Sequence, residues 1–399
     1  MAKVKITGHA SGSGVITVTA PNTSTNRTIT LPDATATIAT TAATDALTTR
    51  VNGASGKKNL VINGAMQVAQ RGVSKSGYTA GGYHTCDRWM HDKAAATGTF
   101  TMTQEADAPV GFKNSLKVNC TTVGSSGSYN AIQTRLESQD TAHLAYGTSS
   151  AKAVTLSFWV KVSQTGNQQM NLLHYADAGV RQISHVYTIN QANTWEKKTV
   201  TFPGDTARVG DDDTTIGFYL EWYLSSYSGR TGSAVLTSWG AYTNAARFEG
   251  ATISIGDSTS DTWQITGVQL EEGSVATEFE GRSFGEELEL CKRYYQQFGH
   301  ASLEQTVGAG VFNTATQILG YFPYHKEMRA IPSISVSSAG FLRAYAGYSG
   351  SKISTGGQPL DGITTTSARF NVSMASSTAG EGAFLQIVGG QYIYLNAEL

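Results

Sequence analysis

Aromatic residues between positions 222 and 242 have the chemistry to bind sugars. Sugar rings present C–H faces that stack on Trp and Tyr, while their hydroxyls need planar polar partners. Glu221, Arg230 and Asn244 supply such partners. Trp222 belongs to the apolar alternation of a strand, and a core position is the alternative for each of the others. Those others flank Gly-rich stretches, and we predict that they form a glycan-binding surface: Tyr223, Tyr227, Trp239 and Tyr242.

The segment from Phe341 to Gln358 is a second candidate surface. Its aromatic and basic side chains are interleaved with Gly and Ser, and it contains no acidic residue. We expect an exposed loop that binds anionic bacterial glycan through charge and stacking; the alternative is an ordinary surface loop. Its attachment should weaken with salt, because exposed charges are screened beyond about 8 Å at physiological ionic strength. The residues concerned are Arg343, Tyr345, Tyr348 and Lys352.

Three consecutive carboxylates, Asp211 to Asp213, form the densest acidic cluster of the sequence. Like charges in a row repel one another unless they are solvated or bound to a hard cation such as Ca²⁺. The spacing is not that of an EF-hand. A solvated turn is the favoured interpretation, and a structural Ca²⁺ at Asp211 and Asp213 is the alternative.

No sequence motif brings potential catalytic side chains together. His84, Asp87 and His91 lie close in sequence, but Trp89 stands between them in a segment that has no helical period. Asp87 and Arg88 are better interpreted as a buried, hydrogen-bonded pair. Glycoside hydrolysis needs two carboxylates that face each other, and nothing in the sequence brings Glu221, Glu249 and Asp261 together. No solenoid repeat is present either, so we expect no catalytic residues and no enzyme activity.

The composition excludes several classes of protein. With 29 basic and 30 acidic residues among 399, the net charge is −1, which is too little positive charge for a phosphate-binding protein, so no nucleic-acid partner is expected. A hydrophobic content of 40% excludes intrinsic disorder. Three unevenly spaced cysteines argue against a disulfide framework and a zinc site. There is no signal-peptide pattern and no long apolar run, so we expect cytosolic synthesis without membrane insertion, and no cofactor.

The strand pattern divides the chain into parts that must position these residues. Residues 1–57 hold short Thr-, Ala-, Ile- and Val-rich alternations that cannot bury their apolar side alone, so this segment should need a partner; a disordered leader is the alternative. Residues 58–283 show one strand pattern after another, such as the alternation from Val154 to Lys161, which predicts an all-β sandwich or jelly roll. Residues 300–399 predict a second, smaller β-sandwich. The fold class is therefore mainly β.

One amphipathic helix is predicted over residues 284–299. Ser283 and Glu286 have the spacing of a capping box, Glu289 and Arg293 form an i,i+4 pair, and Gly299 follows where a C-terminal cap belongs. The apolar stripe packs either on the adjacent β-domains or on copies of itself around a three-fold axis. It consists of Leu288, Cys291, Tyr295 and Phe298.

Several stretches resemble phage tail-fibre and receptor-binding appendage proteins. Gly14–Thr23 with Ile29–Ala34 is similar to their N-terminal segment, and Asn59–Val68 with Asp87–Trp89 looks like the start of their carbohydrate-binding-module-like jelly roll. Thr155–Lys161 and Trp263–Gly273 continue the resemblance. Further similar stretches are Thr194–Glu196, Phe202–Asp205, Glu286–Tyr295 and Met328–Pro332, and residues 268–280 are the most specific part.

The resemblance implies a structural virion protein, a fibrous homotrimer that attaches to the phage tail through residues 1–57 and binds host surface polysaccharide. The C-terminal sandwich would form the tip. The location is then the virion, after synthesis in the host cytoplasm. The alternatives are a polysaccharide-degrading tailspike enzyme and a purely structural decoration protein.

Overall fold

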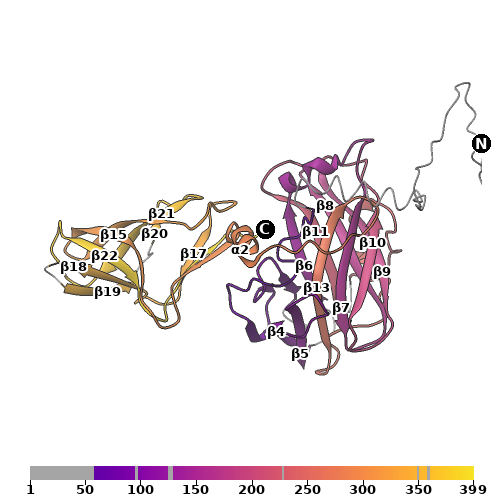
Figure 1. The fold of residues 1–399 in the computed structure, drawn as a ribbon, viewed down its shortest axis with the longest axis horizontal. Helices are drawn as coiled ribbons and strands as arrows, with labels where there is room; N and C mark the ends of the chain where they lie inside the picture. Colours follow the sequence, from indigo (N-terminus) through magenta and orange to yellow (C-terminus); the bar gives the residue numbers. More distant parts are fainter. Residues whose placement is uncertain (1–57, 95–97, 125–128, 227–228, 348–349, 357–359) are drawn as a thin grey trace, which may run out of the picture. The chain divides into compact units, whose positions relative to one another are not determined.

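The computed structural model describes residues 58–94, 98–124, 129–226, 229–347, 350–356 and 360–399 (Figure 1). The predicted virion-anchoring segment 1–57 lies outside these residues, as do Tyr227 and Tyr348. No helix in the described part of the chain is both long enough and apolar enough to span a bilayer.

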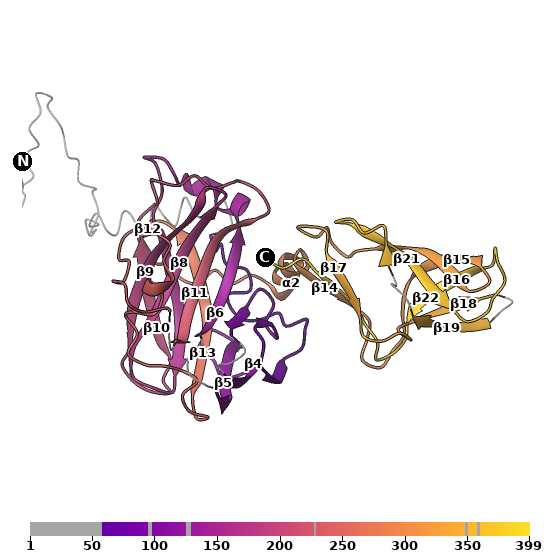
Figure 2. The ribbon, with the colours of Figure 1, turned by 180° about the vertical axis from the view of Figure 1, so that it is seen from behind.

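Two antiparallel sheets form the first sandwich, in agreement with the predicted jelly-roll type (Figures 1 and 2). The six-stranded sheet has the order β1 (Ser74–Tyr78), β4 (Gly98–Glu105), β5 (Ser115–Val123), β13 (Thr262–Glu272), β7 (Val154–Val162) and β10 (Glu196–Phe202). The seven-stranded sheet has the order β12 (Gly240–Ala241), β9 (Gly179–Ile189), β8 (Gly166–Ala176), β11 (Ile216–Ser226), β6 (Tyr129–Glu137), β3 (Met90–Lys93) and β2 (Gly82–Tyr83). Short 3₁₀ turns lie at Ser138–Asp140, Ala142–Leu144 and Asn244–Ala246.

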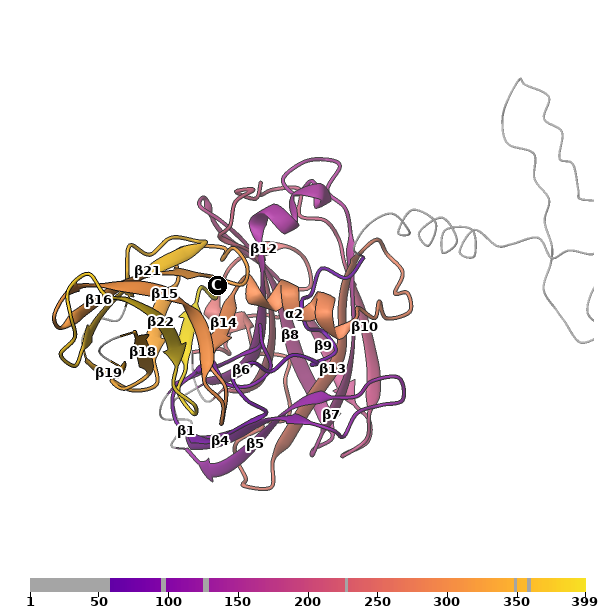
Figure 3. The ribbon, with the colours of Figure 1, turned by 60° about the vertical axis from the view of Figure 1, so that its left-hand side comes forward.

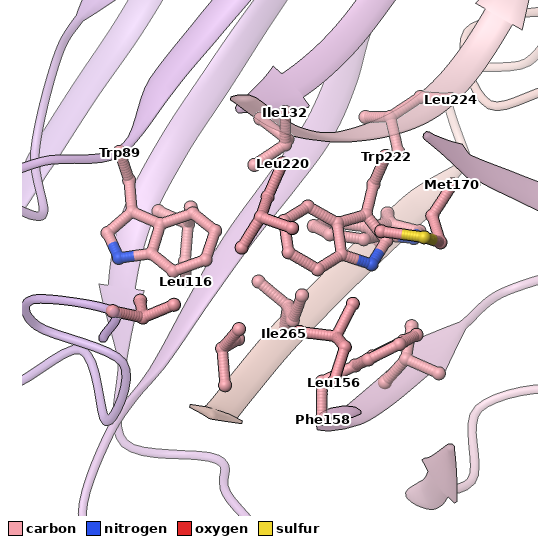
Figure 4. Packing of buried hydrophobic residues seen from close by; sticks show 14 of the residues in the cluster. Trp89, Leu116, Ile132, Leu156, Phe158, Met170, Leu220, Trp222, Leu224 and Ile265 are labelled. Carbon is pink, nitrogen blue, oxygen red and sulfur yellow. The ribbon is translucent and has the colours of Figure 1, made fainter. Parts of the chain in front are cut away.

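The core lies between these two sheets because each central strand alternates. Phe218, Leu220, Trp222 and Leu224 point inward from β11 and are at most 1% exposed. Figure 4 shows Trp222 among Phe158, Met170 and Ile265. The Trp222 ring lies 5.5 Å from the ring of Phe158, edge to face, and 5.7 Å from that of Trp89.

The helix begins where the sequence predicts and ends earlier. Helix α2 spans Phe284–Lys292, and Ser283 and Glu286 form both hydrogen bonds of the capping box. The predicted continuation to residue 299 is wrong: Tyr295–Phe298 is strand β14, which follows α2 (Figure 3). It pairs with β23 (Ile393–Asn396). The backbone hydrogen bonds of β14 are made with a strand almost a hundred residues away. The helical spacing of the sequence cannot reveal such a distant partner.

The four residues of the predicted helical stripe therefore do not lie on one face of a helix. Cys291 is buried within the chain, Leu288 is half-buried on α2, and Tyr295 and Phe298 are buried on β14. The predicted pair of Glu289 with Arg293 is also replaced, since Arg293 Nε donates to Glu137 at 2.7 Å. Glu289 instead binds Lys292. Cys291, Tyr295 and Phe298 are thus buried within the chain, and they do not share one helical face with Leu288.

The C-terminal part is a small sheet and a closed barrel, where a sandwich was predicted. The sheet has the order β14, β23 and β17 (Ser333–Val336). The barrel has the order β16 (Gln317–Pro323), β15 (Gln305–Thr314), β22 (Gly382–Ile387), β18 (Leu342–Ala346), β19 (Gly350–Gly356), β21 (Ser367–Met374) and β20 (Leu360–Asp361). A further pairing of β16 with β21 closes it. Closure removes the two free edges that a sandwich sheet would keep.

Residues 397–399 bind the jelly roll through buried arginines. Glu398 pairs with Arg88, and their side chains are 4% and 1% exposed. Arg71 Nη2 lies 3.1 Å from the other carboxylate oxygen of Glu398, and the Arg88 guanidinium lies 3.5 Å from the Tyr294 ring centroid. Asp87 and Arg88 are both buried, as predicted, but they have different partners. Asp87 lies 3.6 Å from Arg71, and burial raises the pKa of its carboxyl to about 6.

All three cysteines are buried free thiols. Cys86 and Cys120 belong to the core of the first sandwich, and Cys291 lies on α2. Burial raises the pKa of each thiol above its ordinary value.

We predict an acid-sensitive contribution to stability from His91. Its ring is fully buried, with Nδ1 2.6 Å from Tyr78 Oη and Nε2 bonded to Asn130. Burial lowers the pKa of His91 to about 3, while the unfolded chain titrates near 6.5. The neutral folded state therefore contributes stability above pH 6.5, and this contribution falls as pH drops. From pH 7 to pH 5 the loss from one such group is about 2 kcal/mol.

Urea denaturation of wild type and His91→Gln at the two pH values measures this contribution. The variant should lose less stability on acidification than wild type. Equal losses would contradict the assignment.

Candidate functional site

A row of polar side chains crosses the outer face of the seven-stranded sheet. Gln133 on β6, Glu221 on β11, Asn171 on β8 and Ser184 on β9 face one another in register. Gln133 Nε2 donates to Glu221 Oε1 at 2.8 Å, and Asn171 Nδ2 donates to Glu221 Oε2 at 3.2 Å. Ser184 Oγ donates to Asn171 Oδ1 at 2.7 Å. The row is a preorganised hydrogen-bonded network.

The segment that contains Arg247 and ends at residue 251 lies over the middle of this row. Arg247 Nε donates to Glu221 Oε2 at 3.0 Å, and its Nη2 pairs with the other oxygen. The amide of Gln169 donates to the carbonyl of Ala246 at 2.7 Å. Glu221 is 0% exposed and Arg247 is 7% exposed, so the centre of the face is interior.

Two of the residues that were predicted to bind glycan in this region instead make contacts within the chain. Tyr223 is fully buried and was wrongly predicted at the surface: it packs with Phe248, and its hydroxyl accepts from Arg230 Nε at 2.9 Å. Trp239 is half-buried against the core, and its Nε1 donates to the carbonyl of Pro203 at 2.6 Å. Proximity to glycine-rich stretches could not reveal this, because those stretches fold back over the sheet.

Tyr242 lies at the edge of the outer face of the seven-stranded sheet. It is half-buried, and its hydroxyl donates to Asn244 Oδ1 and accepts from Arg247 Nη1, both at 2.6 Å. Its backbone N–H donates to the carbonyl of Val180, which faces Tyr175 across the β8–β9 pair. Tyr242 and Tyr175 therefore belong to the same cross-strand row, with Val180 between them.

The open end of the face is an aromatic and cationic cluster. The rings of Tyr175 and Tyr219 stack at 5.5 Å with 27° between their planes, and the Arg135 guanidinium lies 4.4 Å from the Tyr219 centroid. Tyr219 Oη donates to Gln133 Oε1 at 2.6 Å. Among the described residues, no Asp or Glu side chain forms an ion pair with Arg135, unlike Arg247. Its guanidinium is nevertheless engaged: Nη1 donates to the backbone oxygen of Leu399, and Nη2 donates to Tyr219 Oη and, at 3.4 Å, to Gln133 Oε1. Tyr219 is 7% exposed, so half-buried Tyr175 is the more accessible ring of this cluster.

Sequence reasoning missed this cluster. The alternation of β11 places Tyr219 on the polar face with Glu221, so the sequence could have indicated the position of Tyr219. Arg135 and Tyr175 come from β6 and β8, and only strand pairing brings them together. Burial raises the pKa of both Tyr175 and Tyr219, so their hydroxyls stay protonated at neutral pH.

The predicted C-terminal loop is a β-hairpin. Arg343 and Tyr345 lie on β18, and Lys352 lies on β19. Lys352 faces Ala344, so it points away from the side that carries Arg343 and Tyr345. Arg343 also pairs with Glu304, so the segment carries less unpaired positive charge than predicted. Small inward residues at 344 and 346 hid the strand alternation from sequence reasoning.

The acidic cluster at 211–213 caps a turn. Both oxygens of Asp211 accept from the Asp177 N–H, at 3.0 and 3.1 Å. Asp213 Oδ1 accepts from the N–H and the hydroxyl of Thr215 at 2.9 and 2.6 Å. Within the described residues, no group of three or more His, Cys, Asp or Glu side chains is placed to hold a metal ion.

The carboxylates considered for hydrolysis have separate structural roles. Glu221 binds Arg247, Glu249 accepts from the Gly232 N–H, and Asp261 accepts from three backbone N–H groups at residues 256–258. None of these contacts pairs two of the three.

Comparisons with known proteins give weak likenesses of fold. No protein-family model and no curated protein sequence matches the chain. Similar solved structures include the enzymatically active domain of tailspike protein 4 of bacteriophage CBA120, with 14% identity, a TM-score of 0.31, and coverage of 54% of this chain and 21% of that chain.

Two carbohydrate-binding modules are similar over about half of this chain. The family 11 module of Clostridium thermocellum has 11% identity and a TM-score of 0.27, and the match covers 51% of this chain and 98% of that chain. TmCBM61, solved with β-1,4-galactotriose, has 9% identity and a TM-score of 0.26, with 54% and 99% covered. At TM-scores this low, the function must be inferred from the side chains of this chain.

Proposed function

We propose that the chain is a carbohydrate-binding attachment protein that recognises acidic glycan at the open end of the jelly-roll face. The observation that carries the proposal is the stack of Tyr175, Tyr219 and Arg135. It joins an aromatic surface to a guanidinium that has no ion-pair partner among the described Asp and Glu side chains. An acidic group would replace the Leu399 backbone oxygen, to which Arg135 Nη1 now donates. Arginine binds carboxylates with two parallel hydrogen bonds, which suits the acidic group of a sugar.

The surroundings hold these groups in place before a ligand arrives. Gln133 binds both Glu221 and Tyr219, and Arg247 fixes Glu221 and Tyr242. Rigid polar groups lose little conformational freedom on binding, which favours affinity. A sugar ring would stack on half-buried Tyr175, its hydroxyls would meet Tyr242 and Asn244, and its acidic group would meet Arg135.

We also propose that this protein is the host-attaching fibre or appendage of a phage tail. The support is the sequence resemblance of residues 14–23, 29–34, 59–68 and 268–280 to such proteins. In this proposal residues 1–57 dock on the tail, the assembly is a homotrimer in the virion, and the chain is not an enzyme. Light scattering should give about three times 42.3 kDa, and a chain that lacks residues 1–57 should no longer join the particle.

Replacing Arg135 with Gln or Tyr175 with Ala should weaken binding to acidic polysaccharide at least tenfold. Arg135→Gln removes the charge, and Tyr175→Ala removes the stacking surface; a loss of about 1.4 kcal/mol corresponds to tenfold. Calorimetry with polygalacturonate, alginate and purified bacterial capsule measures the affinity. Wild-type binding should also weaken as salt is raised.

Lys113→Gln is the charge-matched control, because Lys113 is exposed in the loop before β5. It should bind like wild type. If Arg135→Gln and Tyr175→Ala both bind as tightly as the control, the assigned site is wrong. Sizing the polysaccharide after incubation should show its original length, and shortened chains would favour the tailspike alternative.

A further inference from the structure

Three exposed aromatic residues lie on the outer face of the C-terminal barrel. Tyr345 on β18 faces Phe384 on β22, and Phe384 faces Ala309 on β15. Gly310 faces Gly320, so Tyr321 on β16 lies next to Ala309. The exposed fractions are 42% for Tyr345, 67% for Phe384 and 64% for Tyr321. Four adjacent strands thus present one cross-strand row, which we call the aromatic row: Tyr345, Phe384, Ala309 and Tyr321.

The core of the barrel does not need these rings. The inward neighbours Ala344, Leu385 and Phe322 are buried, so the alternation that fills the interior is complete without the aromatic row. Outward positions of a soluble barrel ordinarily carry polar side chains. Contiguous exposed apolar side chains are typical of binding surfaces.

Planar polar groups flank the aromatic row at both ends. Beyond Tyr321, Arg369 makes two hydrogen bonds to Asp361, at 2.6 and 2.8 Å, and Asn371 donates to the same carboxylate at 2.7 Å. Beside Tyr345, Arg343 pairs with Glu304. Each of these two arginines is matched by one carboxylate, so neither contributes an unpaired positive charge. This contrasts with Arg135 on the jelly roll.

The geometry limits what can bind. Every strand of the barrel except the two-residue β20 has at least two neighbours, so a partner finds almost no free strand edge and must contact side chains. The exposed aromatic area is roughly 350 Å², given that each ring buries about 200 Å² when fully covered. A stable protein interface needs about 800 Å² from each partner. The row is too small for that and is suited to a narrow, chain-like ligand.

We infer that the aromatic row is a second carbohydrate-binding site, for an uncharged glycan chain that lies across β18, β22, β15 and β16. Three strand spacings, about 14 Å in total, separate the outer strands. Sugar rings would stack on Tyr345, Phe384 and Tyr321, with small Ala309 leaving room between the last two. This goes beyond the proposed jelly-roll function and does not depend on it.

The test is binding of the full chain to neutral hexasaccharides of glucose, galactose, mannose and N-acetylglucosamine, measured by calorimetry. We expect at least one to bind, with an affinity that is unchanged by salt. Phe384→Ser with Tyr321→Ser should weaken this binding at least tenfold. Phe384→Tyr should preserve it, because the ring is retained. Val110→Ser with Val209→Ser, which also removes two exposed apolar residues, should have no effect.

This experiment tests the jelly-roll site and the aromatic row independently. Arg135→Gln and Tyr175→Ala should leave neutral hexasaccharide binding intact. The inference is overturned if no hexasaccharide binds, or if the Phe384→Ser, Tyr321→Ser variant binds as wild type does. It is also overturned if that variant instead abolishes a concentration-dependent rise in mass, which would assign the row to a second copy.

Discussion

Replacing Arg247 with Met is expected to lower the free energy of unfolding by about 3–5 kcal/mol, as removal of one partner of a buried ion pair does. Glu221 is 0% exposed, and Arg247 supplies two of its hydrogen bonds. The substitution keeps an unbranched side chain but leaves a charged carboxylate in the interior. Guanidinium denaturation followed by tryptophan fluorescence measures the loss.

Arg369→Met is the matched control for this variant. Arg369 also binds a carboxylate with two hydrogen bonds, but its side chain is 56% exposed and that of Asp361 is 36% exposed. Exposed pairs contribute about 0–1 kcal/mol. In the double variant Glu221→Gln, Arg247→Met, part of the loss should be recovered, because no charge remains unpaired. If Arg247→Met costs no more than the control, the buried pair does not stabilise the face.

A loss of similar size is expected for Glu398→Ala. This carboxylate neutralises Arg88, which is 1% exposed, and it also binds Arg71. Without Glu398, Arg88 keeps the Tyr294 ring and the Arg135 carbonyl as neighbours but has lost its carboxylate partner. The free energy of unfolding should fall by about 3–5 kcal/mol.

Glu272→Ala gives the comparison for Glu398→Ala. Glu272 pairs with Lys152 at 3.0 Å, and both side chains are more than 40% exposed, so the expected loss is about 0–1 kcal/mol. Equal effects of the two substitutions in a urea titration would show that Arg88 does not depend on Glu398.

Much of the architecture could be predicted because local patterns determine it. The alternation of β7 and β11 identified the buried side of each strand, and the Ser283–Glu286 spacing located the start of α2. The errors occur where a distant segment decides the outcome. β14 leaves the helical pattern to pair with β23, and β18 and β19 were missed because alanine and glycine give no clear alternation.

The candidate sites were harder to predict than the fold. Tyr223 looked like a surface residue next to flexible sequence, but the chain folds back over it and Arg247 closes the face. The stack of Arg135, Tyr175 and Tyr219 joins three strands from different parts of the sequence, and the aromatic row joins four. Such sites depend on strand register, and only Tyr345 of the barrel rings was identified beforehand.

The three buried thiols have a practical consequence for work with this protein. Alkylating reagents attack thiolates, and burial with a raised pKa keeps Cys86, Cys120 and Cys291 protonated and enclosed at neutral pH. A cysteine introduced at an exposed position such as Val110 would then be the reactive one while the native three stay in place. A fluorophore or biotin attached there would label the folded wild-type core at a single site, for tracking on bacterial cells.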